Sequence, residues 1–77
     1  GYATEITKAL LAYCFRVIKA HRVCALCHPK NIGSWKVLEK CGLRREAYYV
    51  QKVKYLSDGD IHWEDELEYA ILREEFE

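Results

Sequence analysis

Hydrophobic spacing near the start of the chain predicts a helix over residues 3–19. Apolar side chains recur three or four positions apart on one helical face, at Ile6, Leu10, Tyr13, Cys14 and Val17. The next apolar run, residues 21–27, stops before Pro29 and is typical of a strand. Because this run is apolar at successive positions, we expect a central strand that is covered on both faces.

The second half of the chain predicts a helix followed by a hairpin. Asn31 is suited to cap a helix over residues 32–40, and Gly42 to stop it. Strands are expected over residues 43–55 and 61–72, with a turn at residues 57–60. In the first strand, Ala47, Tyr49, Val53 and Tyr55 share one side. In the second strand, apolar residues (Ile61, Trp63, Leu67, Tyr69, Ile71) alternate with polar ones (His62, Glu64, Glu66, Glu68). The alternation predicts an antiparallel hairpin with one apolar face.

The order of these elements indicates an α/β (α+β) fold with two helices and a three-stranded mixed sheet. A central strand needs a neighbour on each side, and no strand is expected before the first helix. We therefore expect part of a larger α/β domain, or a unit that completes itself by association.

Length and charge narrow the possible functions. A chain of 77 residues forms one domain at most and has a thin core. Twelve basic residues balance twelve acidic ones, which argues against nucleic-acid binding. The sequence has no apolar run of the ~20 residues that cross a membrane, and we expect no signal peptide. We expect a cytoplasmic protein that does not act at a membrane.

The four cysteines need a separate interpretation. The run Cys24-Ala25-Leu26-Cys27-His28 matches the C-x-x-C-H pattern of haem attachment, and His21 and His62 would add possible zinc ligands. In a strand, however, residues three apart point to opposite faces. We therefore expect four reduced thiols that are small, buried residues, and no metal.

Four groups of residues, in order and nearly spanning the chain, resemble the second half of a GNAT acetyltransferase. They are Gly1-Tyr2-Ala3-Thr4-Glu5; His21-Arg22-Val23; Asn31-x-x-Ser34-x-x-x-Leu38-Glu39-Lys40-x-Gly42-Leu43; and Asp58-Gly59-x-x-x-Trp63-x-Asp65-x-x-x-Tyr69. The ribosomal-protein alanine N-acetyltransferase-like branch is the most similar. The resemblance implies that residues 1–77 are a partial GNAT domain, the C-terminal half of an acyl-CoA N-acyltransferase fold.

The resemblance also implies a reaction. Acetyl-CoA would lie across a splayed pair of parallel strands, with its pyrophosphate at a helix N-terminus. A primary amine, of a small molecule or a protein N-terminus, would attack the thioester directly, without an acyl-enzyme. The implied acid is Ser34, and the implied cofactor-binding residues are Gly1, Tyr2, Ala3, Thr4, Asn31 and Lys36.

Each of these residues also has an ordinary structural interpretation. Gly1 to Thr4 could simply start a helix, Asn31 could cap one, and Ser34 and Lys36 could be ordinary helix residues. Leu38 stands where the wider family often has tyrosine as the general acid, which leaves the identity of the acid open.

The chain also departs from the family pattern. The family's phosphate loop has further residues before Gly1, and its preceding strand forms one wall of the cofactor cleft. We therefore expect little activity from these 77 residues alone. No general base can be named, and Glu64, Glu66 and Glu68 are expected on a solvated strand face. The alternative is a self-associating module that forms a homodimer through the exposed edge of strand 21–27.

Overall fold

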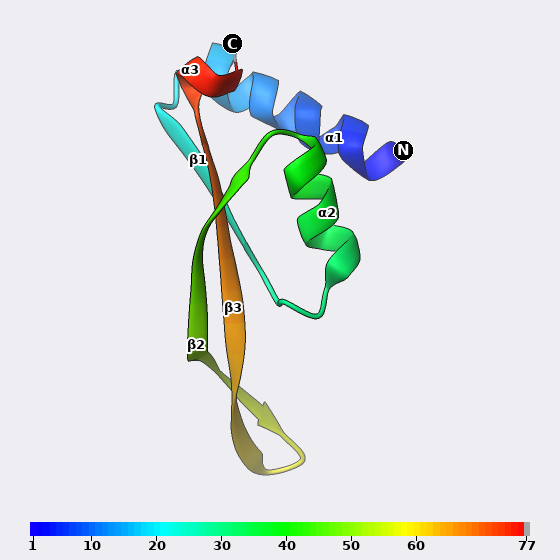
Figure 1. Cartoon of the computed structure of the whole chain (residues 1–77), viewed down its shortest axis with the longest axis vertical. Helices are drawn as coiled ribbons and strands as arrows, with labels where there is room; N and C mark the ends of the chain where they lie inside the picture. The colour runs from blue at the N-terminus through cyan, green and yellow to red at the C-terminus, as the bar shows by residue number, and fades with distance from the viewer. Residues whose placement is uncertain (77) are drawn as a thin grey trace.

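Three strands form one antiparallel sheet in the computed structural model, which describes residues 1–76 (Figure 1). The strands are β1 (Arg22–Cys27), β2 (Arg44–Ser57) and β3 (Asp60–Leu72), in the order β1-β3-β2. The helices are α1 (Tyr2–Ala12), which continues into the π-helical turn η1 (Tyr13–Val17), α2 (Ile32–Lys40) and α3 (Arg73–Phe76). In Figure 1 the helices gather around one end of the sheet, and the β2–β3 hairpin projects beyond them.

Two expectations about the sheet are corrected. Both pairs of neighbouring strands, β1 with β3 and β2 with β3, are antiparallel. The sheet formed by these three strands is therefore not mixed. β3 is the central strand rather than β1, since β3 pairs with both of the others. Exposure alternates along β1, with Val23, Ala25 and Cys27 half-buried and the residues between them exposed. One face of β1 is therefore covered, not two.

The first helix forms where expected but buries a different face. Leu11 and Phe15 are 3% and 2% exposed, whereas the predicted face is open at Ile6, Leu10, Tyr13 and Val17. The sequence carries two apolar stripes, and the stripe through Leu11 and Phe15 is the one that meets this sheet. A helix that is apolar on more than one side is suited to lie between two layers.

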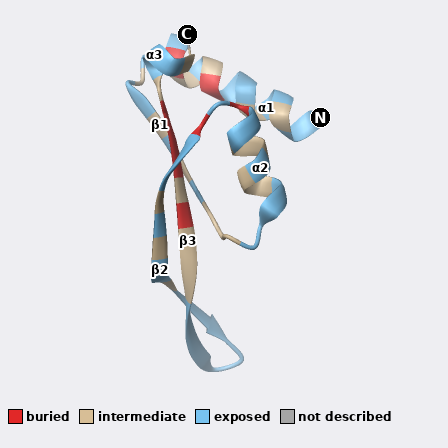
Figure 2. Cartoon of the chain, viewed as in Figure 1, coloured by how far each residue is buried: buried red, intermediate tan, exposed pale blue. Residues whose placement is uncertain are grey.

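The core lies where this helix crosses the C-terminal half of β3 (Figure 2). It is built from seven buried residues: Leu11, Phe15, Cys41, Leu43, Leu67, Tyr69 and Ile71. The ring of Phe76 in α3 packs on Phe15 with 5.3 Å between ring centroids. Towards its tip the hairpin is exposed, including Ile61 and Trp63. The predicted apolar side of β3 is therefore buried only beneath the helices, and there Ala70, on the other side of the strand, is buried as well.

The hairpin is antiparallel as predicted, but it does not have a single apolar face. Pairing places Tyr49 opposite Glu66 and Val53 opposite Glu64, so the apolar side chains of β2 share a face with the glutamates of β3. Register shifts between Arg45 and Ala47, and again between Tyr49 and Val53, set this arrangement. The turn forms at Asp58 and Gly59, both with positive φ, as in a type I′ turn.

The cysteines confirm one expectation and correct another. All four are free thiols, and Cys24 and Cys27 lie on opposite faces of β1 as predicted. Cys41 is buried, but Cys24 is exposed because it lies on the uncovered face. Within residues 1–76 no group of three or more His, Cys, Asp or Glu side chains is arranged to hold a metal ion. The described helices also include none with the length and apolar character needed to cross a bilayer.

Candidate functional site

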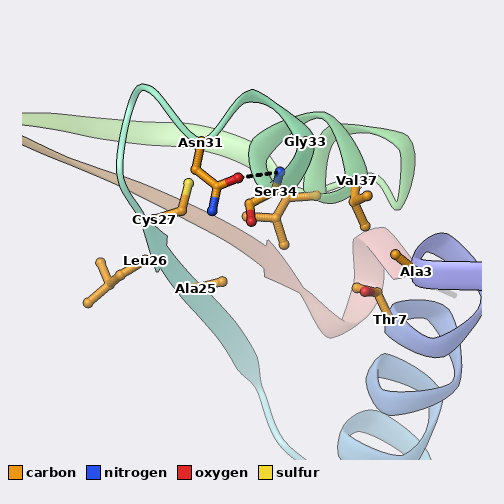
Figure 3. Close-up of a pocket in the computed structure, with 10 residues that line it drawn as sticks. Ala3, Thr7, Ala25, Leu26, Cys27, Asn31, Gly33, Ser34 and Val37 are labelled. Carbon is orange, nitrogen blue, oxygen red and sulfur yellow. Dashed lines mark hydrogen bonds between the residues drawn. The ribbon is translucent and has the colours of Figure 1, made fainter.

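A cavity of about 640 Å³ opens between α1, β1 and α2. Its volume lies within the ~300–1,000 Å³ typical of small-molecule sites. Ten residues line it: Ala3, Thr7, Ala25, Leu26, Cys27, Asn31, Gly33, Ser34, Val37 and Leu38 (Figure 3). The lining is mostly small and apolar, with a few polar groups at the start of α2.

The N-terminus of α2 supplies these polar groups. Asn31 caps the helix by accepting a hydrogen bond at Oδ1 from the Ser34 N–H, at 3.3 Å. This bond occupies the oxygen of the side-chain amide and leaves its nitrogen turned toward β1 (Figure 3). The Ser34 side chain lies on the same side of α2. Asn31 is therefore a cap, as the local pattern predicts, and also presents an amide donor to the cavity.

The opposite side of α2 holds the helix against the sheet. The Trp35 indole N–H donates to the carbonyl of Pro29 at 3.0 Å, which fixes the turn before the helix. The Tyr69 hydroxyl, from the buried part of β3, donates to Glu39 at 2.6 Å. Arg45 lies over the rings of both Trp35 and Tyr69. Burial, together with the bond to Glu39, raises the pKa of Tyr69, so its hydroxyl stays a donor at neutral pH.

β1 faces the cavity along its outer edge. Three successive residues, Ala25, Leu26 and Cys27, line the space, although neighbouring side chains in a strand point to opposite faces. The cavity therefore follows the edge of the strand, where backbone N–H and C=O groups are presented. Burial raises the pKa of the Cys27 thiol, which keeps it protonated and poorly nucleophilic at neutral pH.

The structure brings together three of the seven residues singled out from the sequence. Ala3, Asn31 and Ser34 line the cavity. The other four, Gly1, Tyr2, Thr4 and Lys36, lie outside its lining. Tyr2 is 85% exposed and Lys36 is also exposed, whereas the carbonyl of Thr4 accepts from the Cys41 thiol. A functional role for each of the seven residues stays a prediction.

Sequence reasoning missed the rest of the lining. Thr7 lies one helical turn after Ala3, so helix periodicity alone could have indicated it. Val37 and Leu38 follow from Ser34 in the same way, three and four residues on, and Gly33 lies one turn before Val37. Ala25, Leu26 and Cys27 could not be identified from spacing in the sequence. They line the cavity because β1 is an edge strand, and the order of the strands in the sheet decides this. A Cβ added to Gly33 would meet no atom within 4 Å, so the space before α2 is open at this residue.

The chain is similar to proteins of one acetyltransferase family. The family described as acetyltransferase (GNAT) domain matches residues 1–44. The uncharacterised N-acetyltransferase YnaD of Bacillus subtilis is 43% identical over 76 residues, which cover 99% of this chain and 42% of that protein. The probable N-acetyltransferase YjcK of the same organism is 39% identical over 72 residues, covering 94% of this chain and 38% of that protein.

Solved structures agree with this similarity. A GNAT-family acetyltransferase from Bacillus anthracis superposes with a TM-score of 0.87 at 45% identity, covering 97% of this chain and 43% of that one. The spermidine N-acetyltransferase SpeG of Vibrio cholerae superposes with a TM-score of 0.85 at 21% identity, covering 99% and 43% of the two chains, and this likeness concerns the fold. The chain thus spans less than half the length of these proteins.

Proposed function

The chain belongs to the GNAT acetyltransferase family, and we propose that it forms one wall of the acetyl-CoA cleft of an N-acetyltransferase. The acceptor is a primary amine of a small molecule or a protein N-terminus. The observation that carries the proposal is the cavity between the β1 edge and the start of α2, where Asn31 and Ser34 meet small apolar residues. Residues 1–77 are, in this proposal, part of a larger catalytic domain.

The lining suits a long, flexible thioester. Backbone groups along the β1 edge and the Asn31 amide nitrogen provide hydrogen bonds to an amide-containing arm. The small residues Ala3, Ala25 and Gly33 leave room for it. The start of α2 adds N–H groups and a partial positive charge that favour polar or anionic parts of the ligand. Bound acetyl-CoA supplies the activated acetyl group.

Ser34 is the proposed acid. As the amine nitrogen bonds to the acetyl carbon, the carbon–sulfur bond breaks and the thiolate leaves. The Ser34 hydroxyl donates its proton to that sulfur and is reprotonated by solvent, while the nitrogen releases a proton as the amide forms. Cys27 takes no part as a nucleophile, because its thiol stays protonated. This agrees with direct attack and no acyl-enzyme.

A blocking substitution tests the proposal. Gly33→Leu should place a large side chain in the open space before α2, and leucine is also a better helix former than glycine. Calorimetry with acetyl-CoA should show binding lost in this variant, with the melting temperature kept or raised. The matched control is Lys40→Leu, an exposed position of the same helix outside the cavity lining, which should bind like the parent chain. Equal binding by the parent chain and Gly33→Leu would overturn the proposal.

We expect the 77-residue chain alone to bind acetyl-CoA weakly and to transfer little acetyl group, because it supplies one wall of the cleft. Sub-micromolar binding by a monomer of this chain would contradict that expectation.

A second candidate function is self-association through β1. Within residues 1–76, β1 pairs only with β3, so its other edge is available to another copy. Light scattering would then detect a dimer. Because the same edge borders the cavity, acetyl-CoA should compete with pairing. A monomer at high concentration would exclude this candidate.

A further inference from the structure

A second, smaller cavity of about 290 Å³ lies at the end of β1. It is lined by His28, Tyr55, His62 and Glu64. His28 follows Cys27, which lines the larger cavity, and the Asn31 N–H donates to the carbonyl of His28 at 2.9 Å. One short turn, residues 28–31, therefore contributes to both cavities and places them side by side.

Hydrogen bonds define the charge of this smaller cavity. The Lys30 backbone N–H donates to Nδ1 of His28 at 3.0 Å, so that nitrogen carries no proton. The ring proton is then on Nε2, which donates to Glu64 Oε1. His62 Nε2 lies 3.5 Å from the other Glu64 oxygen, and the His62 ring stacks on Tyr55 with 5.8 Å between centroids. His28 thus donates from Nε2 and holds the Glu64 side chain in place.

Glu64 differs from the other paired glutamates of this protein. In the described part of the chain, Arg22, Arg44, Arg45 or Lys52 pairs with each of the following: Glu39, Glu46, Glu66, Glu68 and Glu75. Both ion-pair partners of Glu64 are histidines instead. The lining therefore holds one half-buried carboxylate beside aromatic rings and, among the described residues, no Lys or Arg. Glu64, Glu66 and Glu68, which were expected on a solvated strand face, thus form ion pairs with neighbouring side chains. Of the three, Glu64 is the one that lines a cavity.

We infer that this cavity is a subsite for a positively charged group of the amine acceptor, an ammonium or a guanidinium, held by the Glu64 carboxylate. The rings of Tyr55 and His62 supply π surfaces against which such a cation also packs favourably. His28 is a positioning residue, because it orients Glu64 and need not touch the ligand. The inference rests on the proposed function, and it specifies an acceptor that carries a second cationic group beside the reacting amine.

Titration of the ¹⁵N-labelled 77-residue chain with 1,4-diaminobutane tests the inference. Signals of His28, Tyr55, His62 and Glu64 should shift, and 1,4-butanediol, which is neutral and similar in length, should leave them unchanged. Glu64→Gln should weaken diamine binding about tenfold, as expected for loss of a charge-assisted hydrogen bond. Glu66→Gln is the matched control, because Glu66 lies on the same face of β3 but pairs with Lys52. This control should bind normally.

A conservative variant separates charge from structure. Glu64→Asp keeps the carboxylate and should recover part of the binding, even if Glu64→Gln proves unstable. Equal diamine binding by the parent chain and a folded Glu64→Gln variant, or equal losses in Glu64→Gln and Glu66→Gln, would overturn the inference. An acetyl-CoA titration reports on a different set of residues, around Asn31 and Gly33. If the chain bound the diamine but not acetyl-CoA, the result would count against the proposed function and not against the cation site.

Discussion

The two ends of the first helix have different surroundings, although Ala3, Thr7, Leu11 and Phe15 follow one another at four-residue spacing along the same side. Leu11 and Phe15 point into the core beneath β3, whereas Ala3 and Thr7, nearer its start, line the large cavity. Leu11 and Phe15 are almost completely buried, and their side chains have no polar atoms. The cavity residues are small or polar and partly open. Stability and ligand binding therefore depend on separate residues, although α1 contributes to both, and substitutions should separate the two properties.

The largest expected effect is on the core. Phe15→Ala should lower the free energy of unfolding by about 3–5 kcal/mol, because it leaves a cavity where the ring met Phe76 and the sheet. Chemical denaturation monitored by circular dichroism measures this loss. Val17→Ala, at a position that is 62% exposed, should change stability by less than about 0.5 kcal/mol. Similar losses in the two variants would mean that the helix is buried on its other face.

A smaller effect is expected at Asn31, where the two properties meet. Asn31→Ala should cost about 1 kcal/mol, because it removes the cap on the Ser34 N–H, and it should also weaken acetyl-CoA binding. Asn31→Asp keeps a capping oxygen but removes the amide donor, so it should retain stability and still lose binding. Thermal melts and calorimetry on both variants measure the two effects. Normal binding by Asn31→Asp would show that the amide nitrogen does not contact the ligand.

The smallest effect concerns the exposed part of the hairpin and depends on pH. Asp65 accepts hydrogen bonds from the Tyr48 hydroxyl and from the Gln51 N–H, where Gln51 has a φ of 49°. These bonds lower the pKa of Asp65, the one from Tyr48 most. A carboxyl group whose pKa is lower in the folded than in the unfolded state stabilises the fold. This stabilisation is fully present when the pH is above the pKa of the unfolded state, about 3.9, and it is lost as the pH falls through the pKa of the folded state.

Asp65→Asn removes this titration. The stability difference between the parent chain and this variant should be greatest at neutral pH and should disappear in strong acid. Urea unfolding at a series of pH values measures it. A difference that stays constant across the range would show that Asp65 acts through its shape and not through its charge.

Local signals in the sequence predicted local structure well. The Asn31 cap and the Gly42 stop define α2 as Ile32–Lys40, as predicted, because both act on the backbone next to them. The Asp-Gly pair likewise produces the hairpin turn. The resemblance to GNAT proteins is confirmed by the family match over residues 1–44.

Features that depend on distant partners were not predictable in this way. The position of β1 at an edge, the choice between two apolar stripes on α1 and the register shifts in β2 all depend on which strands pair. The pairing of Glu64 with His28 joins residues 36 positions apart, and neither one carries a local signal for it. Sequence reasoning therefore identified the Asn31 side of the cavity but missed its β1 wall.

Amide-by-amide NMR titration with acetyl-CoA tests most directly whether the cavity between β1 and α2 binds the cosubstrate. The account predicts shifts that saturate at Ala25, Leu26, Cys27, Gly33 and Ser34, with the core amide of Phe15 unchanged. Shifts confined to the hairpin tip, or no saturable shift along β1 and the start of α2, would contradict it.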